Sequence, residues 1–383
     1  MIKISKKTLQ DLEYKSVVEQ IAELNVTSLG KTKILNTVPF SNRNEVSRSL
    51  NLTNEFLTSF ENENRIPNHG FEDITKELKL IKIENNYLEI NGFRKIASCC
   101  ITSNILIKFF KKHKDYYPLL NTLSSTNVIN TIIPDAINDV IDKHGEIRNN
   151  ASDLLYTTRK SIQSVRTKVN SSFNSALSTY NSAEYLDDIR ETVMENRRVL
   201  AVKSMHRRKV KGSILGSSKT GSIVYIEPET THQHQRELNN LEFEETEEIK
   251  RILLELTSLI SVYSNYLSKC QFYLTEMDVI YAKAKYAKSI QAVLPKITET
   301  QEIYLVDAYH PLLLVSNRKE ETKTYPQTIT MTTKSRIIVI SGPNAGGKSI
   351  TLKTVGLLQL MVQSGMLIPV HESSKVCLFD SIL

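Results

Sequence analysis

The sequence predicts a multidomain fold that is mainly α-helical, with α/β structure toward its C-terminus. Three observations predict it. Two long segments carry narrow apolar stripes at helical spacing, short β-branched segments lie between them, and a glycine-rich loop is set between an expected strand and an expected helix. The chain of 383 residues is long enough for two or three domains, each with its own hydrophobic core.

Residues 1–150 are expected to form a compact helical core. Between Ser5 and Leu24, apolar residues recur at intervals of three to five, which is typical of one buried helix face. The pattern breaks near Pro39 and Pro67, where proline lies among polar residues.

Residues 151–196 and 231–295 each contain a long helical pattern. In the first, Leu155, Ile162, Val169 and Ala176 recur every seven residues, and a helix over 30 residues would span roughly 45 Å. In the second, an apolar seam continues in steps of three and four from Leu238 to Leu274. Matching seams predict an antiparallel coiled-coil arm, with the intervening residues 197–230 at its far end.

Residues 197–230 are predicted to be rich in β structure, because "RRVLAVK" and "GSIVYIEPE" combine β-branched residues with flanking Gly and Ser. A basic run within 15 residues contains no acidic residue. Such a run is often only a solvated surface, but a self-repelling cluster at the end of an arm favours contact with a phosphate backbone. The candidate nucleic-acid contacts are Arg197, Arg198, Lys203, Arg207, Arg208, Lys209 and Lys211, together with Lys219 in the polar loop 217–220.

Residues 296–383 change to an α/β pattern. Strands are expected in "EIYLVDA", in "QTITMT" and, as a short buried strand, in "RIIVIS". The helix that follows from Gly347 is apolar almost all round, as expected for a helix packed inside a larger α/β domain. We expect this part to be the N-terminal portion of a nucleotide-binding domain that is incomplete in this chain.

The glycine-rich loop fits the phosphate-binding pattern G-x-x-x-x-G-K-[ST] and has the strand and helix that the pattern requires on either side. Its backbone N–H groups and the helix N-terminus would hold ATP phosphates, with Lys348 at the β- and γ-phosphates and Ser349 as a Mg²⁺ ligand. The alternative is a chance glycine-rich turn. The predicted phosphate-binding residues are Gly342, Pro343, Asn344, Ala345, Gly346, Gly347, Lys348 and Ser349.

The catalytic residues of ATP hydrolysis are not assigned. An acidic residue on a later strand should hold Mg²⁺, and only Glu372 and Asp380 follow Lys348. Asp380 is interpreted as structural. This chain alone is therefore expected to bind ATP weakly and to hydrolyse little of it.

Composition narrows the cellular setting. A net charge of +7 suits a partner that carries phosphate. The four cysteines have no pairing or metal-ligand spacing, which favours a reducing compartment, and no apolar run reaches the length of a membrane span. Without a signal peptide pattern, the expected location is cytoplasmic.

Several histidines are candidates for a nucleotide or metal site. His310, before Pro311, is interpreted as a turn residue that caps local backbone, with a position near a nucleotide base as the alternative. His206, His232 and His234 lack the spacing that would complete a metal site.

Particular segments resemble the MutS family. "SGPNAGGKS" is similar to that family's phosphate loop, and "DAYHPLL" resembles the segment that opens its ATPase domain. "TLQDLEYKSVVEQI", "IPNHGFEDI" and "DKHGEIRNNAS" resemble its second bacterial branch, which lacks the mismatch-reading N-terminal domain, and "TGSIVYIEPETTHQHQRELNNLEFEE" is similar to the clamp and returning lever helix of that branch. The similarity extends over essentially the whole chain.

This resemblance implies a helical core, two lever helices with a β-rich clamp at their tip, and an ABC-like ATPase that dimerises in the full-length protein. It implies ATP and Mg²⁺ as cofactors and DNA, including branched DNA, as partner in repair or recombination control. The alternatives are a factor that binds rRNA in collided ribosomes, and a coiled-coil nucleotide sensor that binds a protein. A small-molecule kinase would leave the arm without a role. C-terminal nuclease-like domains known in the branch are not found in this sequence, so nuclease activity is not assigned.

One motif of the wider family is interpreted structurally. Mismatch readers insert the Phe of a Phe-x-Glu motif into DNA, but here Phe243-Glu244-Glu245 lies in the predicted returning helix among five glutamates. A carboxylate cluster repels DNA. Phe243 is therefore predicted to pack in the seam of the arm, and direct mismatch recognition is not expected.

Overall fold

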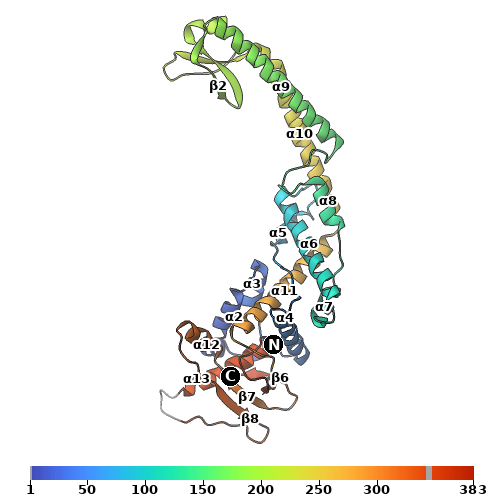
Figure 1. Cartoon of the computed structure of the whole chain (residues 1–383), viewed down its shortest axis with the longest axis vertical. Coiled ribbons are helices and arrows are strands. Elements are labelled where there is room, and N and C mark those ends of the chain that lie inside the picture. The colour runs from blue at the N-terminus through green and yellow to red at the C-terminus, as the bar shows by residue number, and fades with distance from the viewer. Residues whose placement is uncertain (1, 342–346) are drawn as a thin grey trace. The chain divides into compact units, whose positions relative to one another are not determined.

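The computed structural model describes residues 2–341 and 347–383, which form mainly helices and three small sheets (Figure 1). The predicted multidomain, mainly α fold with α/β character is confirmed at this level. The chain divides into two compact units. The first unit comprises Met1–Lys82, Asn91–Asp135 and Ser261–Leu383, and the second comprises Ile83–Ile90 and Ala136–Ile260.

The first unit is a helical assembly with short strands. Its helices are α1 (Lys6–Asp11), α2 (Tyr14–Ala22), α3 (Ser28–Leu35), α4 (Arg43–Thr58), α5 (Thr75–Leu80), α6 (Ile90–Lys112), α7 (Pro118–Ser125), α11 (Ser264–Ser289), α12 (Pro311–Lys319) and α13 (Lys348–Gln363). Helix α8 (Ile132–Val140) runs from residues of this unit into residues of the second.

Two small sheets complete the first unit. Strand β1 (Lys3–Ile4) pairs in parallel with β10 (Ser381–Ile382). A second sheet has the order β6-β9-β7-β8, in which β7 and β8 are antiparallel. Its strands are β6 (Lys296–Ile297), β7 (Ile303–Ala308), β8 (Gln327–Met331) and β9 (Lys375–Val376).

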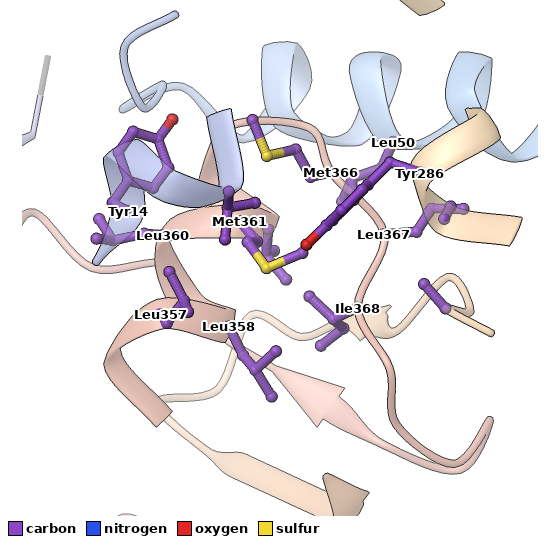
Figure 2. Close-up of a cluster of buried hydrophobic side chains, with 14 of the residues drawn as sticks. Tyr14, Leu50, Tyr286, Leu357, Leu358, Leu360, Met361, Met366, Leu367 and Ile368 are labelled. Atoms are coloured by element: carbon purple, nitrogen blue, oxygen red, sulfur yellow. The ribbon is translucent and has the colours of Figure 1, made fainter. Parts of the chain in front are cut away.

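The core of the first unit is a large apolar cluster, shown in Figure 2. The second half of α13 contributes Leu357, Leu358, Leu360 and Met361, which are almost completely buried. They pack with side chains from α2, α4 and α11, including Tyr14. This half of α13 is apolar apart from Gln359 and Gln363, which are buried and donate hydrogen bonds to the Cys377 and Phe379 carbonyls, so burial on all sides removes most apolar area from water.

A buried carboxylate joins α3 to α11. Asp278 is fully buried and accepts hydrogen bonds from the backbone N–H groups of Val26 and Thr27, at 2.9 Å each, and from the Thr27 hydroxyl. The Nε2 atom of His69 lies 3.1 Å from Oδ1, the same oxygen that accepts from Val26. Burial alone would raise the pKa of Asp278, but these hydrogen bonds hold it below its usual range.

The second unit contains an antiparallel pair of long helices, α9 (Asp153–Ser182) and α10 (Glu229–Ser261), which lie side by side in Figure 1. Their apolar contact is small, made by Ile162, Val165 and Leu238. Hydrogen bonds join the two helices along the same contact, and residue numbers rise along α9 while they fall along α10. The pairs are Ser152 with Glu248, Arg159 with Glu245 and Arg166 with Glu242. We call this helix pair the arm.

A four-stranded antiparallel sheet follows α9 in the chain and has the order β2-β3-β5-β4. It packs on the end of α9 through Phe173, Leu200 and Ile226. The elements are β2 (Leu186–Met194), β3 (Arg197–Lys203), β4 (Gly212–Ser217) and β5 (Ile223–Pro228), with a short 3₁₀ helix η1 (Ser204–Lys209) between β3 and β4.

The structure corrects the predicted extents of the two long helices. The segment 151–196 is helical only to Ser182, because Glu184 takes a left-handed φ of 58° and strand β2 follows. The seam predicted from Leu238 to Leu274 is interrupted after Ser261, and α11 begins as a separate helix at Ser264.

The short buried strand predicted in "RIIVIS" is wrong. Residues 336–341 form no strand, and Ile337 and Val339 are more than 80% exposed. A strand needs a hydrogen-bonding neighbour, and β8 pairs with β7 rather than with this segment.

Candidate nucleotide and nucleic-acid sites

The predicted phosphate-binding segment leads into helix α13. Gly347 is the residue before the helix and has a left-handed φ of 78°, a conformation that glycine adopts without steric cost. Lys348 and Ser349 are the first two helical residues, and Ser349 is exposed. The other predicted members, Gly342, Pro343, Asn344, Ala345 and Gly346, lie outside the described residues.

The local charge at this helix start favours an anion. The first turn of α13 contains no acidic residue, and it carries the partial positive charge of a helix N-terminus. Lys353, one turn further on, is paired at 3.1 Å with Glu13, the residue that precedes α2. Lys348 and Ser349 are therefore placed where an ammonium group and a hydroxyl can meet a phosphate and its Mg²⁺.

The opposite end of α13 is held by an extensive set of contacts. Gly365, with a φ of 68°, and Met366 donate backbone hydrogen bonds to Val362 and Met361, which is the pattern of a Schellman motif. The ammonium group of Lys283 donates to the Ser364 carbonyl at 2.7 Å, and the Tyr14 hydroxyl lies 2.7 Å from the Ser364 hydroxyl. This end of the helix is therefore anchored to α2 and α11.

Two of these anchors have displaced pKa values. Burial lowers the pKa of Lys283 to about 8, and the charge of Lys33 acts in the same direction. Burial raises the pKa of Tyr14 to about 12, against the opposing hydrogen bond from Ser364. Both shifts come from desolvation of the charged form.

The predicted capping role of His310 is confirmed. His310 is the N-cap of α12, and its Nδ1 atom accepts a hydrogen bond from the N–H of Leu313 at 3.5 Å. Burial lowers the pKa of His310, which favours the neutral ring that can accept a hydrogen bond at a helix start.

The basic residues of the second unit fall into two groups. Arg197 and Arg198, on strand β3, are paired across the sheet with Glu227 at 3.0 Å and Glu191 at 2.6 Å. Arg198 also lies over the ring of Phe173. Although the sequence places no acid inside the basic run, strand pairing brings carboxylates to these two residues, and Arg198 also joins the sheet to α9.

The remaining basic candidates are exposed. Arg207, Arg208 and Lys209 project from η1, and Lys211 and Lys219 are exposed nearby in the chain, while Lys203 is half-buried. Helix η1 packs on Tyr185, because the His206 ring lies 4.8 Å from the Tyr185 ring and the Lys209 ammonium group lies over that ring. We call Arg207, Arg208, Lys209 and Lys211 the basic turn.

The polar loop 217–220 is an ordered turn. The Ser218 backbone N–H donates to the Ile223 carbonyl at 2.9 Å, and the Thr220 and Ser222 hydroxyls lie 2.8 Å apart. Gly221 closes the turn with a φ of 71°.

The sequence did not reveal the role of the acidic run on α10. Glu242 and Glu245 pair with arginines of α9, and Glu248 accepts from Ser152, so these glutamates join the two helices. The prediction that Phe243 packs in the seam is wrong, because its side chain faces away and the residue is 66% exposed. The signal that could have revealed the pairing is the matching order of Arg159 and Arg166 on the outgoing segment.

Among the described residues, no group of three His, Cys, Asp or Glu side chains could hold a metal ion. His232 lies 3.9 Å from Glu227 and His234 lies 3.9 Å from Glu237, so they belong to separate pairs. The four cysteines are free and buried. In the part of the chain that the structure covers, no helix combines the length and apolar character needed to cross a bilayer.

Comparison with curated proteins finds similarity along almost the entire chain. Over 99% of its length it is 29% identical to the endonuclease MutS2 of Alkaliphilus oremlandii (strain OhILAs), covering 47% of that protein. It is 31% identical over 98% of its length to that of Geobacillus sp. (strain WCH70), covering 47%, and 32% identical over 99% to that of Pediococcus pentosaceus, covering 48%. No family model matches the chain. The chain spans about half the length of these relatives, and it is similar to these MutS2 proteins over nearly all of its own length.

Proposed function

We propose that this chain is an ATP-dependent nucleic-acid-binding part of a MutS-type protein that acts on DNA in repair or recombination control. The observation that carries the proposal is the basic turn, whose cations are exposed at the sheet that follows the arm, while neighbouring arginines are paired with carboxylates. Exposed, uncompensated Lys and Arg side chains are the residues that neutralise phosphates. The endonuclease activity in the relatives' name is not proposed for this chain.

ATP is proposed to bind at the start of α13. Gly347 in a left-handed conformation, a helix start without acidic residues, and Lys348 and Ser349 in the first turn fit a nucleotide phosphate with Mg²⁺. Mg²⁺ would be held by Ser349 and the phosphates and would neutralise their charge. In the full-length protein, the nucleotide site is proposed to be completed in a homodimer, as the family resemblance implies.

The nucleotide and the nucleic acid are proposed to be coupled through the helices that act as levers. The C-terminal end of α13 is bonded to Lys283 on α11, and only two residues of chain separate α11 from α10 of the arm. A displacement of α13 on nucleotide binding would therefore act on α11 and, through the chain, on the helix that returns from the sheet. In this proposal the sheet and basic turn form a clamp on DNA.

Salt-dependent binding tests the nucleic-acid part. The quadruple variant Arg207→Gln, Arg208→Gln, Lys209→Gln, Lys211→Gln should bind duplex and four-way-junction DNA more weakly, and the slope of log K against log salt should fall by about 3–4. The matched control replaces the exposed Lys108, Lys111, Lys112 and Lys114 of the first unit with Gln. Unchanged DNA affinity in the first variant, or preference for ribosomal RNA over both DNA forms, would contradict the proposal.

Nucleotide binding is tested separately by Lys348→Ala. The variant should lose binding of ATP with Mg²⁺ in equilibrium dialysis, while Lys353→Ala, one turn along the same helix, should retain it. Equal ATP binding by the wild type and Lys348→Ala would show that the start of α13 is not the nucleotide site. If DNA affinity is also measured with and without ATP, loss of the ATP effect in Lys348→Ala tests the coupling.

A further inference from the structure

A cavity of about 460 Å³ lies in the first unit, and neither the start of α13 nor the basic turn contributes to its lining. Its walls come from the end of α4, the segment 65–69 and the last two turns of α11. A volume of this size is in the range of small-molecule sites, roughly 300–1,000 Å³. The residues proposed to bind ATP and DNA do not line this cavity, so neither proposed site explains it.

One wall of the cavity is aromatic. The rings of Phe56, Phe60 and Tyr281 meet edge to face or tilted, with centroids 5.7–6.1 Å apart, and the His69 ring lies 4.8 Å from that of Tyr281. Four rings that contact one another form a rigid surface with polarisable faces. Such surfaces hold planar aromatic ligands, because nucleobases stack on aromatic side chains.

The other wall is cationic. Arg65, Lys285 and Lys288 line the cavity, and no Asp or Glu is among its described lining residues. The ammonium groups of Lys285 and Lys288 lie over the rings of Tyr281 and Phe60, at 5.3 and 5.4 Å from the ring centroids. Positive charge is therefore concentrated beside the aromatic wall, where it can meet an anionic group attached to a planar ligand.

The floor of the cavity is built and held in place. His69 is buried, and its Nε2 atom lies 3.1 Å from Asp278, whose carboxylate is itself fixed by the backbone of Val26 and Thr27. The ring therefore has a set orientation before any ligand arrives. Preorganised side chains reduce the entropy lost when a ligand binds.

We propose that this cavity is a binding site for a nucleoside phosphate, with the base against the aromatic wall and the phosphate between Lys285, Lys288 and Arg65. A purely apolar ligand would leave three cations unpaired, and inorganic phosphate would leave the aromatic wall unused. The same chemistry is presented by a free nucleotide and by the terminal nucleotide of a single strand. The site is separate from the start of α13 and does not depend on the function proposed there.

The experiment uses the full chain with Lys348→Ala, so that nucleotide binding at α13 is removed. The probe is 2-aminopurine riboside 5′-monophosphate, whose fluorescence falls on stacking, and the chain has no tryptophan to interfere. Binding should be weakened at least tenfold by Lys285→Gln with Lys288→Gln and by Tyr281→Leu. The control pair Lys111→Gln with Lys112→Gln, both exposed on α6, should leave it unchanged.

Binding of further ligands shows whether the nucleotide at this site is free or is the end of a single strand. The unphosphorylated nucleoside and inorganic phosphate should each bind at least tenfold more weakly than the nucleotide. Tighter binding of a 5′-phosphorylated single-stranded trinucleotide than of the mononucleotide assigns the site to a strand end, and the reverse order assigns it to a free nucleotide. The proposal is overturned if neither ligand binds, or if the two-lysine variant, whose exposed positions leave the fold intact, binds as tightly as its parent.

Discussion

The cores of the two units are built from different interactions. The first unit buries a large apolar cluster in which the second half of α13 is enclosed on every side. The arm of the second unit has a narrow seam around Ile162, Val165 and Leu238, accompanied by ion pairs between α9 and α10. The stability of the first unit should therefore follow buried area, and that of the arm should also follow ionic strength.

This difference suits the two proposed tasks. A nucleotide site needs a rigid support. Close packing around the second half of α13 provides it, while the proposed site lies at the start of the same helix. An arm that carries the proposed clamp needs two helices whose axes stay aligned, and the ion pairs between α9 and α10 can provide this without a large apolar core. Paired charges also fix the register of the arm, since a shift along α9 by one turn would separate Arg159 from Glu245 and Arg166 from Glu242.

The largest expected effect comes from opening the core of the first unit. Leu360→Ala removes a fully buried side chain and should lower the free energy of unfolding by about 2–5 kcal/mol. Leu352→Ala lies on the same helix but is 69% exposed, so it should change stability by less than about 0.5 kcal/mol. Denaturant unfolding followed by hydrogen exchange in α13 measures both. Equal effects would mean that α13 is not enclosed as described.

A second substitution tests the end of α13. In Gly365→Ala the new Cβ would meet the Ser49 hydroxyl at 2.0 Å, and the residue would keep a left-handed φ of 68°. The expected loss is about 2–4 kcal/mol, since strain in the backbone adds to overpacking. Gly221→Ala has a similar φ of 71° but meets no atom within 4 Å, so it should lose only about 1–2 kcal/mol. Identical losses would remove the case for tight packing around Gly365.

The pH dependence of the first unit should reveal Lys283. Its pKa is about 8 in the folded state and higher when unfolded, so the unfolded state binds more protons between these values. The contribution of Lys283 to stability should rise from pH 8 to pH 10 by up to about 1.4 kcal/mol per unit of pH, and Lys283→Met should abolish it. The raised pKa values of Cys99, Cys100 and Cys377 act in the opposite direction above about pH 8.5, and that of Tyr14 above about pH 10. The measured quantity is therefore the difference in stability between the wild type and Lys283→Met, and a difference that does not change over this range would contradict a buried lysine at this position.

The smallest effects are expected in the arm. Arg159→Gln should lower stability by about 1 kcal/mol, because Arg159 is partly buried and also donates to the Ile147 carbonyl at 2.8 Å. Arg166→Gln removes a more exposed pair and should cost less than about 0.5 kcal/mol. Urea unfolding at two ionic strengths, followed by hydrogen exchange in α9, should show both losses shrinking with salt. Losses independent of salt would mean that packing, not charge, joins the helices.

The sequence predicted what depends on local pattern. Residues 153–182 are helical, strands β3, β5, β7 and β8 lie where β-branched residues cluster, and α13 starts directly after the predicted Gly347. The sequence pattern instead placed the residues of β2 in the outgoing helical segment 151–196, and it did not predict β4, which is rich in Gly and Ser. It also placed the exposed segment 336–341 in a sheet, because composition cannot show whether a neighbouring strand is present.

The candidate sites show the same division. The phosphate-binding pattern is a contiguous run, so it could be recognised directly, although only its last three residues are among those described. The partners of Arg197 and Arg198 lie on other strands, and the aromatic cavity combines residues more than 200 positions apart, such as Phe56 and Tyr281. Such groupings arise only when the chain folds.

The anchored end of α13 has a mechanical consequence. A helix of 16 residues is about 24 Å long, and the bonds to Lys283 and Tyr14 act as a pivot at one extremity. A small displacement of Gly347 would rotate α13 about that pivot rather than shift it along its axis. The rotation would then act on Lys283 and Tyr14, which contact Ser364, and the rigidity of these contacts would determine how much of the displacement is transmitted.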